Sequence, residues 1–193
     1  MAGNNGKQIR VAGSGRVLIA PAGTDAPASA GVDWDTTKWT DLGYTTTDGI
    51  KFNKKDKIDP VDTWQSVSPA RFIYSDRDLT VKFQLLQLNK DTLSFFMGGG
   101  EVKVGTAVGD LKEFTYDLAN SPAPDERALG IEFTDGTAKY RFVIPRGQVT
   151  ETEEIAMTRT GAVKLGVTFT ALAKDDNAPL ASFRIKELAA SYS

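Results

Sequence analysis

Apolar and polar residues alternate along several short segments of the chain, which is the pattern of β-strands with one buried face. The clearest case is Leu79 to Leu85, where every second residue is apolar. Similar patterns predict further strands at residues 16–20, 44–52, 72–74, 111–118, 163–171 and 183–185. Together they indicate roughly eight to ten strands in a mainly antiparallel fold.

Two more strands flank the dipeptide Asp135-Gly136. Asp-Gly is favoured in two-residue type I′ turns, because both central residues need positive φ. A turn at these two positions places Glu132 opposite Lys139 on one face. The other face is then apolar and consists of Leu129, Ile131, Phe133, Ala138, Tyr140 and Phe142.

One short helix is expected near residues 90–97. Asn89 is a suitable N-cap, and Leu88 and Leu93 occupy the positions of a hydrophobic staple around it. Gly98 is suited to end the helix. The sequence therefore predicts a mainly β domain with two packed antiparallel sheets, as a β-sandwich or partly open barrel, and one flanking helix.

Residues 53–69 are highly charged, contain two prolines and are predicted to form a long loop. The segment is longer than the usual hairpin connection, and it contains apolar residues that a solvated loop does not need. One interpretation is a surface loop of mixed charge. The other is a contact with a second protein chain, made by Lys54, Lys55, Lys57, Ile58, Asp59, Val61, Trp64 and Val67.

The two ends of the chain lack apolar periodicity. Residues 1–15 are rich in glycine and asparagine and are predicted to be a flexible arm. Residues 188–193 follow the last clear strand and are predicted to be a tail. We expect a single domain across residues 1–193, with these two arms outside its core.

Composition excludes several kinds of chemistry. The 193 residues include no histidine and no cysteine, so Ser-His-Asp catalysis, disulfides and cysteine-ligated metals are ruled out. We expect no cofactor and no metal. The net charge of −2 argues against a dedicated nucleic-acid-binding protein. No apolar run predicts a signal peptide or a membrane helix.

Three carboxylates, Glu151, Glu153 and Glu154, lie close together in the sequence. Paired carboxylates can act as acid and base, so a hydrolase that uses carboxylates alone is one interpretation. A solvated acidic face is the simpler one, because nothing else in this segment indicates a pocket.

Several segments together resemble the major tail tube proteins of phages with long, noncontractile tails, particularly phages of actinobacteria. The resemblance extends from about residue 15 to about residue 187. The segments that match are VLIAPAGT (17–24), WTDLGYTTTDGI (39–50), WQSVSPARFIYSDRDLTVKFQLLQLNKDTLSFFMGG (64–99) and ALGIEFTDGTAKYRFVIPRGQVTE (128–151).

This resemblance implies a structural protein without catalytic residues, related in fold to the tube proteins of type VI secretion. Such subunits form hexameric rings that stack into the tube through which genomic DNA passes. The implied partners are further copies of the chain, a tape measure protein, a tail terminator and distal tail proteins. The implied location is the virion tail, after synthesis in the host cytoplasm.

A tube must pass DNA without holding it, and a wall of like charge repels the phosphates. We therefore expect a neutral or acidic lumen, with Glu151, Glu153 and Glu154 as candidates to line it. The alternative function is a monomeric β-sandwich module that binds a carbohydrate or protein ligand. Its stacking platform would consist of Trp34, Trp39 and Trp64.

Overall fold

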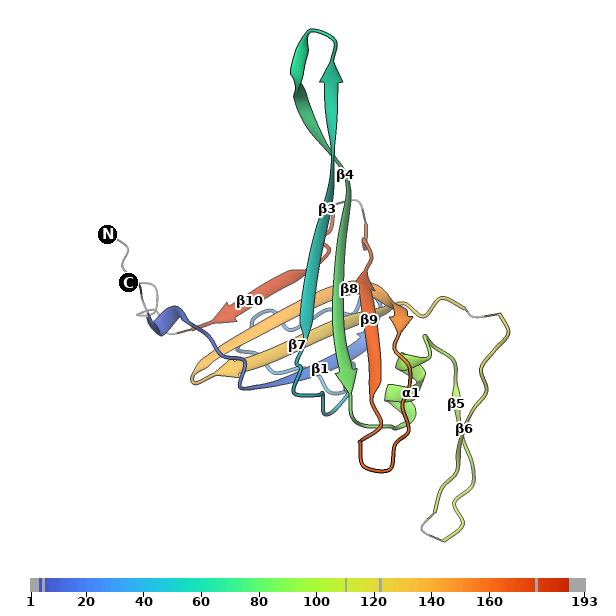
Figure 1. The fold of residues 1–193 in the computed structure, drawn as a ribbon. Helices are drawn as coiled ribbons and strands as arrows, with labels where there is room; N and C mark the ends of the chain where they lie inside the picture. The colour runs from blue at the N-terminus through green and yellow to red at the C-terminus, as the bar shows by residue number, and fades with distance from the viewer. Residues whose placement is uncertain (1–3, 5, 110, 122, 176, 188–193) are drawn as a thin grey trace.

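The computed structural model describes residues 4, 6–109, 111–121, 123–175 and 177–187. This part of the chain is mainly β, with two antiparallel sheets and one short α-helix, which confirms the predicted fold class (Figure 1). The larger sheet consists of β1 (Ser14–Pro21), β2 (Thr40–Asp41), β3 (Lys51–Thr63), β4 (Ser66–Leu85), β7 (Arg127–Asp135), β8 (Ala138–Thr152), β9 (Leu165–Ala171) and β10 (Ser182–Lys186). The smaller sheet pairs β5 (Val102–Val104) with β6 (Phe114–Tyr116).

The larger sheet divides at β8. Its strand order is β2-β1-β7-β8-β9-β4-β3, and β10 also pairs with β8. β10 pairs with residues 139–143 of β8, whereas β9 pairs with residues 147–152. Beyond this division, β9 and β4 cross over β7 and β1, so that the sheet folds over itself (Figure 1).

The main core lies between these two halves of the sheet. It is a cluster of apolar side chains from β1, β4, β7, β8, β9 and the helix α1 (Lys90–Phe96). Phe95 of α1 is stacked with Phe83 of β4 and Phe169 of β9, at ring-centroid distances of 6.2 and 6.0 Å. The helix therefore closes one end of the core.

A second, smaller cluster covers the opposite face of β1 and β7. Its members are Leu18, Ala20, Trp34, Trp39, Ala128 and Val143. Trp34 and Trp39 belong to residues 22–50, which connect β1 with β3 and include the short strand β2. We call this segment the β1–β3 connection, and its two tryptophans lie across this face. Because both faces of β1 are covered, residues 17–20 form a continuous apolar run instead of an alternating one.

The helix begins where the sequence predicts. Asn89 Oδ1 accepts hydrogen bonds from the backbone N–H groups of Asp91 and Thr92, both at 3.0 Å. The Thr92 hydroxyl in turn accepts one from the Asn89 N–H at 2.9 Å, completing a capping box. Gly98 follows the helix with φ of 75°, a conformation that suits glycine.

The β7–β8 hairpin has the predicted apolar face but a different turn. Asp135 pairs with Ala138, so the two turn residues are Gly136 and Thr137. Gly136 has φ of 59°, and no non-glycine residue in the described ranges has positive φ, so the type I′ turn is wrong. Glu132 consequently pairs with Arg141 instead of Lys139. The observed register differs from the predicted one by two residues, so each side chain stays on its predicted face of the sheet.

The segment 53–69 is not a loop, which corrects the prediction. β3 continues to Thr63, the chain reverses at Trp64-Gln65, and β4 begins at Ser66. β4 then continues to Leu85, so the strands predicted at residues 72–74 and 79–85 are parts of one strand with no turn between them. Solvent contacts both faces of this outer hairpin, so neither face needs to be uniformly apolar and no alternation marks the strands.

Other predicted boundaries also shift. In the range 44–52 only Lys51 and Phe52 belong to a strand, because residues 44–50 form a connection with a single bridge from Thr45 to Leu85. In the range 111–118 only β6 is a strand, and its partner β5 lies where the pattern predicts no strand. The predictions for residues 1–3, 5 and 188–193 lie outside the described residues.

Candidate assembly surfaces

The most prominent surface is the outer part of the β3–β4 hairpin, which projects beyond the rest of the molecule at the top of Figure 1. The structure places all eight predicted contact residues on this hairpin: Lys54, Lys55, Lys57, Ile58, Asp59, Val61, Trp64 and Val67. Trp64 lies in the tip with 98% of its surface exposed. An exposed tryptophan at the end of a projecting hairpin is typical of a contact with another protein.

The register places further apolar residues on one side of this hairpin. Ile58 pairs with Tyr74 and Pro60 pairs with Phe72. Directly paired residues share a face of the sheet, and successive residues of β3 point to opposite faces. Because Phe52 pairs with Val81, and Ile58 and Pro60 follow Phe52 by even numbers of residues, these four residues lie on the same side as Val81 and the core. Ser75 is the extra residue of a bulge, and it sets Tyr74 opposite Ile58. The apolar side of the sheet therefore continues past the body into solvent.

Phe72, Ile73 and Tyr74 are further contact candidates that the sequence pattern does not predict. All three are exposed, and they adjoin the predicted residue Ile58 across the hairpin. Their consecutive apolar character was the available signal, but it was attributed to a separate buried strand.

A charged collar separates the projecting apolar residues from the body. Asp56 accepts a hydrogen bond from Lys54, and one of 2.9 Å from Arg77 Nε on the neighbouring strand. These two hydrogen bonds, from Lys54 first and then Arg77, hold the pKa of Asp56 below its ordinary value. The collar therefore stays ionised at neutral pH and keeps this part of the hairpin hydrated.

β3 is also the last strand in the larger sheet. Its outer edge has no neighbouring strand in the described part of the chain. Free edges of this length pair readily with another chain unless they are blocked. Pro60 and the charged residues of β3 limit such pairing.

The acidic segment lies at the end of β8. Glu151 Oε2 is 3.7 Å from Lys82 Nζ, and Glu153 accepts a hydrogen bond from Gln84 Nε2 at 2.5 Å. Both glutamates therefore face the outer side of β4, where Lys82 and Gln84 alternate with buried residues. Glu154 is also exposed, just beyond the strand.

This outer face offers no chamber for a hydrolase that uses carboxylates. The hollow next to Glu153 has a volume of about 80 Å³. Substrate pockets usually measure about 300–1,000 Å³. The geometry therefore favours a solvated polar face.

Two of the three tryptophans cannot form a ligand platform, which contradicts the predicted stacking surface. Trp34 and Trp39 are only 5% and 2% exposed, and their rings pack edge to face at 4.6 Å. They anchor the β1–β3 connection to the sheet. Only Trp64 is available to a partner.

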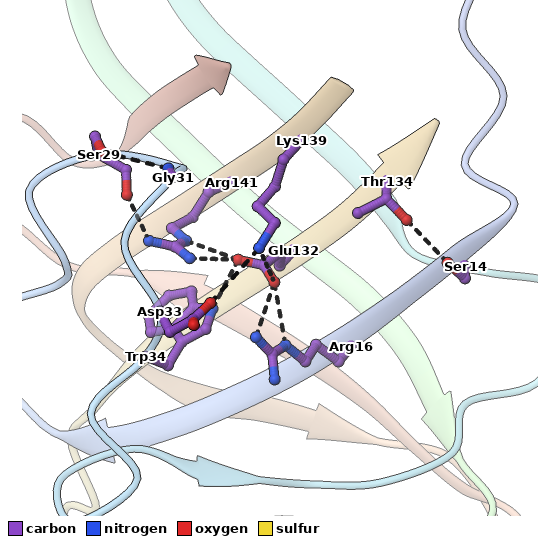
Figure 2. A network of polar contacts seen from close by, with 10 residues as sticks. All are labelled: Ser14, Arg16, Ser29, Gly31, Asp33, Trp34, Glu132, Thr134, Lys139 and Arg141. Atoms are coloured by element: carbon purple, nitrogen blue, oxygen red, sulfur yellow. Dashed lines mark hydrogen bonds and ion pairs between the residues drawn. The ribbon is translucent and has the colours of Figure 1, made fainter. Parts of the chain in front are cut away.

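A buried ionic network fixes this connection in place, and Figure 2 shows Glu132 at its centre. Glu132 accepts hydrogen bonds from Arg16 of β1, Arg141 of β8 and the Trp34 indole N–H. Arg141 is fully buried, lies 4.3 Å from the Trp34 ring centroid and donates to the Ser29 carbonyl at 2.8 Å. The network therefore joins three strands, β1, β7 and β8, to the connection that covers them.

Burial alone would raise the pKa of Glu132. The hydrogen bonds from Arg141 and Arg16 outweigh this effect, so the pKa lies below its ordinary value. The carboxylate is therefore charged at neutral pH and holds the two guanidinium groups together. Sequence reasoning placed Glu132 on the polar face opposite Lys139 and missed the network, although Lys139 Nζ does approach Glu132 within 3.7 Å.

Comparison with known proteins identifies the family. A family model described as "Phage tail tube protein" matches residues 1–193, the whole chain. The chain belongs to the phage tail tube protein family. A search of curated proteins found no match.

As a member of this family, the chain is a structural component of a virion tail and self-associates into a tube. The family is one of structural proteins and not of enzymes. In this tail tube protein, no group of three or more acidic side chains within the described ranges is arranged to hold a metal ion. Among the described helices, none is long and apolar enough to cross a membrane.

The N-terminal segment of this tail tube protein contacts the body before β1 begins. Arg10 donates to Glu187 Oε2 at 2.9 Å and to the hydroxyl of Tyr140. The Val11 N–H donates to Asp135 Oδ2 at 3.2 Å. Residues 10–15 are therefore docked, and Ser14 and Gly15 belong to β1, which corrects the predicted extent of the flexible arm.

Proposed function

We propose that the chain is the subunit of a phage tail tube, in which rings of subunits stack into a conduit for DNA during ejection. The single observation that supports this most strongly is the projecting β3–β4 hairpin. It exposes large apolar side chains on a strand pair that is solvated on both faces. A monomer gains no stability from such a surface, whereas a polymer buries it.

Rings require a heterologous interface, in which two different surfaces of the subunit meet and the rotation closes. The apolar side of the projecting hairpin supplies one surface of this kind. A ring of six is supported by analogy with the fold family. The resemblance adds the tape measure protein, the tail terminator and distal tail proteins as partners.

The assembly hypothesis is tested by electron microscopy of the concentrated purified protein and of Trp64→Ala. We expect tubes or stacked rings from the unchanged chain and few from Trp64→Ala, because the variant loses the apolar anchor at the tip. Val32→Ala is the matched control, since Val32 is also exposed but lies in the β1–β3 connection. Both variants should unfold at the same temperature as the unchanged monomer.

Hydrogen exchange supplies a second readout. Amides in residues 53–69 should exchange faster in the monomer than in the tube, because assembly buries the outer hairpin. Monomers without rings or tubes at high concentration, or equal amide exchange rates in the two states, would contradict the proposal and favour a monomeric binding module.

We also infer that the outer face of β4, β9 and β8 lines the lumen. This face combines Glu151 and Glu153 with Lys82 and neutral residues, among them Gln84 and Thr170. Positive charge on it is thus offset by carboxylates, so it would neither attract nor trap a DNA duplex. Any remaining electrostatic force between this face and the DNA decays over about 8–10 Å at moderate salt.

The lumen assignment is tested by replacing Glu151 and Glu153 with lysine. We expect tubes of this double variant to retain short duplex DNA at low salt and release it at high salt, whereas unchanged tubes retain none. Replacing Asp33 and Asp48 with lysine is the matched control for net charge. An assembled structure with a net basic inner wall would refute the assignment.

A further inference from the structure

An apolar groove lies between the start of α1 and the β5–β6 hairpin. Its volume is about 750 Å³, and its walls include Leu88, Leu93, Val104 and Phe114. Leu88, Val104 and Phe114 are each about half exposed. This is the size and lining of a pocket that receives an aromatic anchor.

The helix terminus in this groove is not a site for an anion. α1 has only seven residues, and two N–H groups of its first turn, those of Asp91 and Thr92, already donate to the Asn89 side chain. The groove therefore suits an apolar occupant with polar groups at its rim.

The groove and the Trp64 tip lie at opposite ends of the molecule. In Figure 1 the β3–β4 tip is at the top, and α1 with the β5–β6 hairpin is at the lower right. β4 joins these two regions, since it begins two residues after Trp64 and ends four residues before Asn89. At a rise of roughly 3.3 Å per residue, its 20 residues span about 65 Å.

The charges at the two ends are complementary. Lys90 and Lys112 flank the groove, and only Asp91 opposes them among its lining residues. At the tip, Asp62 is the only charged residue between Pro60 and Ala70. Within the described ranges, Asp62, Lys90 and Lys112 form no ion pair.

We propose that this groove receives the β3–β4 tip of a second copy of the chain, with Trp64 in the apolar pocket and Asp62 beside the rim lysines. Complementary surfaces at opposite ends of one subunit produce an open head-to-tail series, which is the arrangement that stacked rings require. The inference rests on the proposed tube function, and it names the surface that the projecting hairpin contacts.

The absence of cysteine from the chain allows a direct test by cross-linking. One preparation has Gln65→Cys at the tip, and the other has Lys112→Cys at the groove. Mixed, assembled and treated with a short bismaleimide, they should give a covalent dimer on a denaturing gel. Gln65→Cys mixed with Lys174→Cys, which lies in the connection after β9, is the matched control and should give none.

Exchanging the charges of Asp62 and Lys112 tests the same contact without a cross-linking reagent. Asp62→Lys and Lys112→Asp should each raise the critical concentration for assembly by about tenfold, and the double variant should return it toward the original value. Val104→Asp should block the groove and prevent assembly. Its melting temperature, measured alongside, separates a blocked groove from a misfolded one.

The outcomes separate the two proposals. Featureless monomers from the unchanged chain would refute the tube function itself. Tubes that form without a Gln65–Lys112 cross-link, and without rescue by the double charge exchange, would leave the tube function intact and overturn the groove assignment.

Discussion

At the scale of single residues, one buried carboxylate determines how the β1–β3 connection is held. Glu132 contacts Arg16, Arg141 and Trp34 at once, and Arg141 reaches the connection a second time through the Ser29 carbonyl. A buried charge in such a network costs most when its partners are left behind. Glu132 is therefore more sensitive to substitution than any surface carboxylate of this chain.

Glu132→Gln should destabilise the monomer by about 3 kcal/mol, because two guanidinium groups lose their buried counter-charge. Urea denaturation measures the loss. Glu126→Gln is the matched control, since it removes a glutamate that pairs with Arg146 at the surface, and it should cost much less. Equal losses in the two variants would show that burial of the network contributes nothing.

The same network predicts a pH dependence. The pKa of Glu132 is lower in the folded state, so the network stabilises the fold above the ordinary glutamate pKa of about 4.3. This contribution is lost as the pH falls through the lower folded-state pKa. Stability of the unchanged chain should therefore fall more steeply than that of Glu132→Gln between neutral pH and acid. Parallel curves from urea titrations would contradict this.

Gly130 permits the close approach of Trp34 to β7. A Cβ at this position would lie 2.3 Å from Trp34 Cη2, so the ring would have to move. Gly130→Ala should destabilise the monomer by about 1–3 kcal/mol and shift the tryptophan fluorescence. Gly13→Ala adds a methyl group where nothing lies within 4 Å, and it should change neither property.

At the scale of elements, the helix and the hairpins differ in how far local sequence determines them. The start of α1 could be predicted because Asn89, Leu88 and Gly98 act on their immediate neighbours. The outer β3–β4 hairpin could not, because strand patterns depend on one buried face and this hairpin has none in the monomer. Its apolar residues become interpretable only after the register is known.

The candidate surfaces show the same limit. The sequence singles out the eight hairpin residues as contact candidates because Ile58, Val61, Trp64 and Val67 are unusual within a charged segment, and their role in a contact stays a prediction. It did not place Tyr74 beside Ile58, because that neighbour relation depends on a bulge at Ser75. It also could not bring Trp34 to Glu132, which is 98 residues away in the chain.

Asn89→Ala tests the element for which local sequence is sufficient. The variant should lose about 1 kcal/mol of stability, because two backbone N–H groups at the start of α1 lose their acceptor. Thermal unfolding measures the loss. Asn120→Ala, in an exposed loop, is the control and should be neutral. An unchanged melting temperature in Asn89→Ala would show that tertiary packing alone holds the helix.

At the scale of the whole molecule, the chain combines a body that encloses an apolar core with exposed apolar surfaces, which we propose are covered by other copies. Within the described part of the chain, the main core contains side chains of neither the hairpin tip nor the groove. Self-association therefore requires no refolding of the body. This separation explains why one short sequence can specify both a folded monomer and a polymer.

Deleting residues 2–8 tests this separation. The deletion keeps Arg10, whose contacts with Glu187 and Tyr140 fix the start of the docked segment. We expect a nearly unchanged thermal midpoint of the monomer, together with slower tube formation, because a segment rich in glycine and asparagine can order further when it binds a neighbour. A deletion that unfolds the monomer would place the arm in the core, and normal assembly would make it a passive tail.

The length of β4 has a mechanical consequence. Its first half belongs to the projecting hairpin and its last six residues pair with β9 in the body. A pull on the tip, as when a tail is stretched or bent, is therefore directed along the strand. Hydrogen bonds of an antiparallel pair lie perpendicular to the strands, so this force shears them all together and does not open them one at a time. Tension applied at the tip would thus reach the core as shear along the paired strands, the direction in which their hydrogen bonds resist force most strongly.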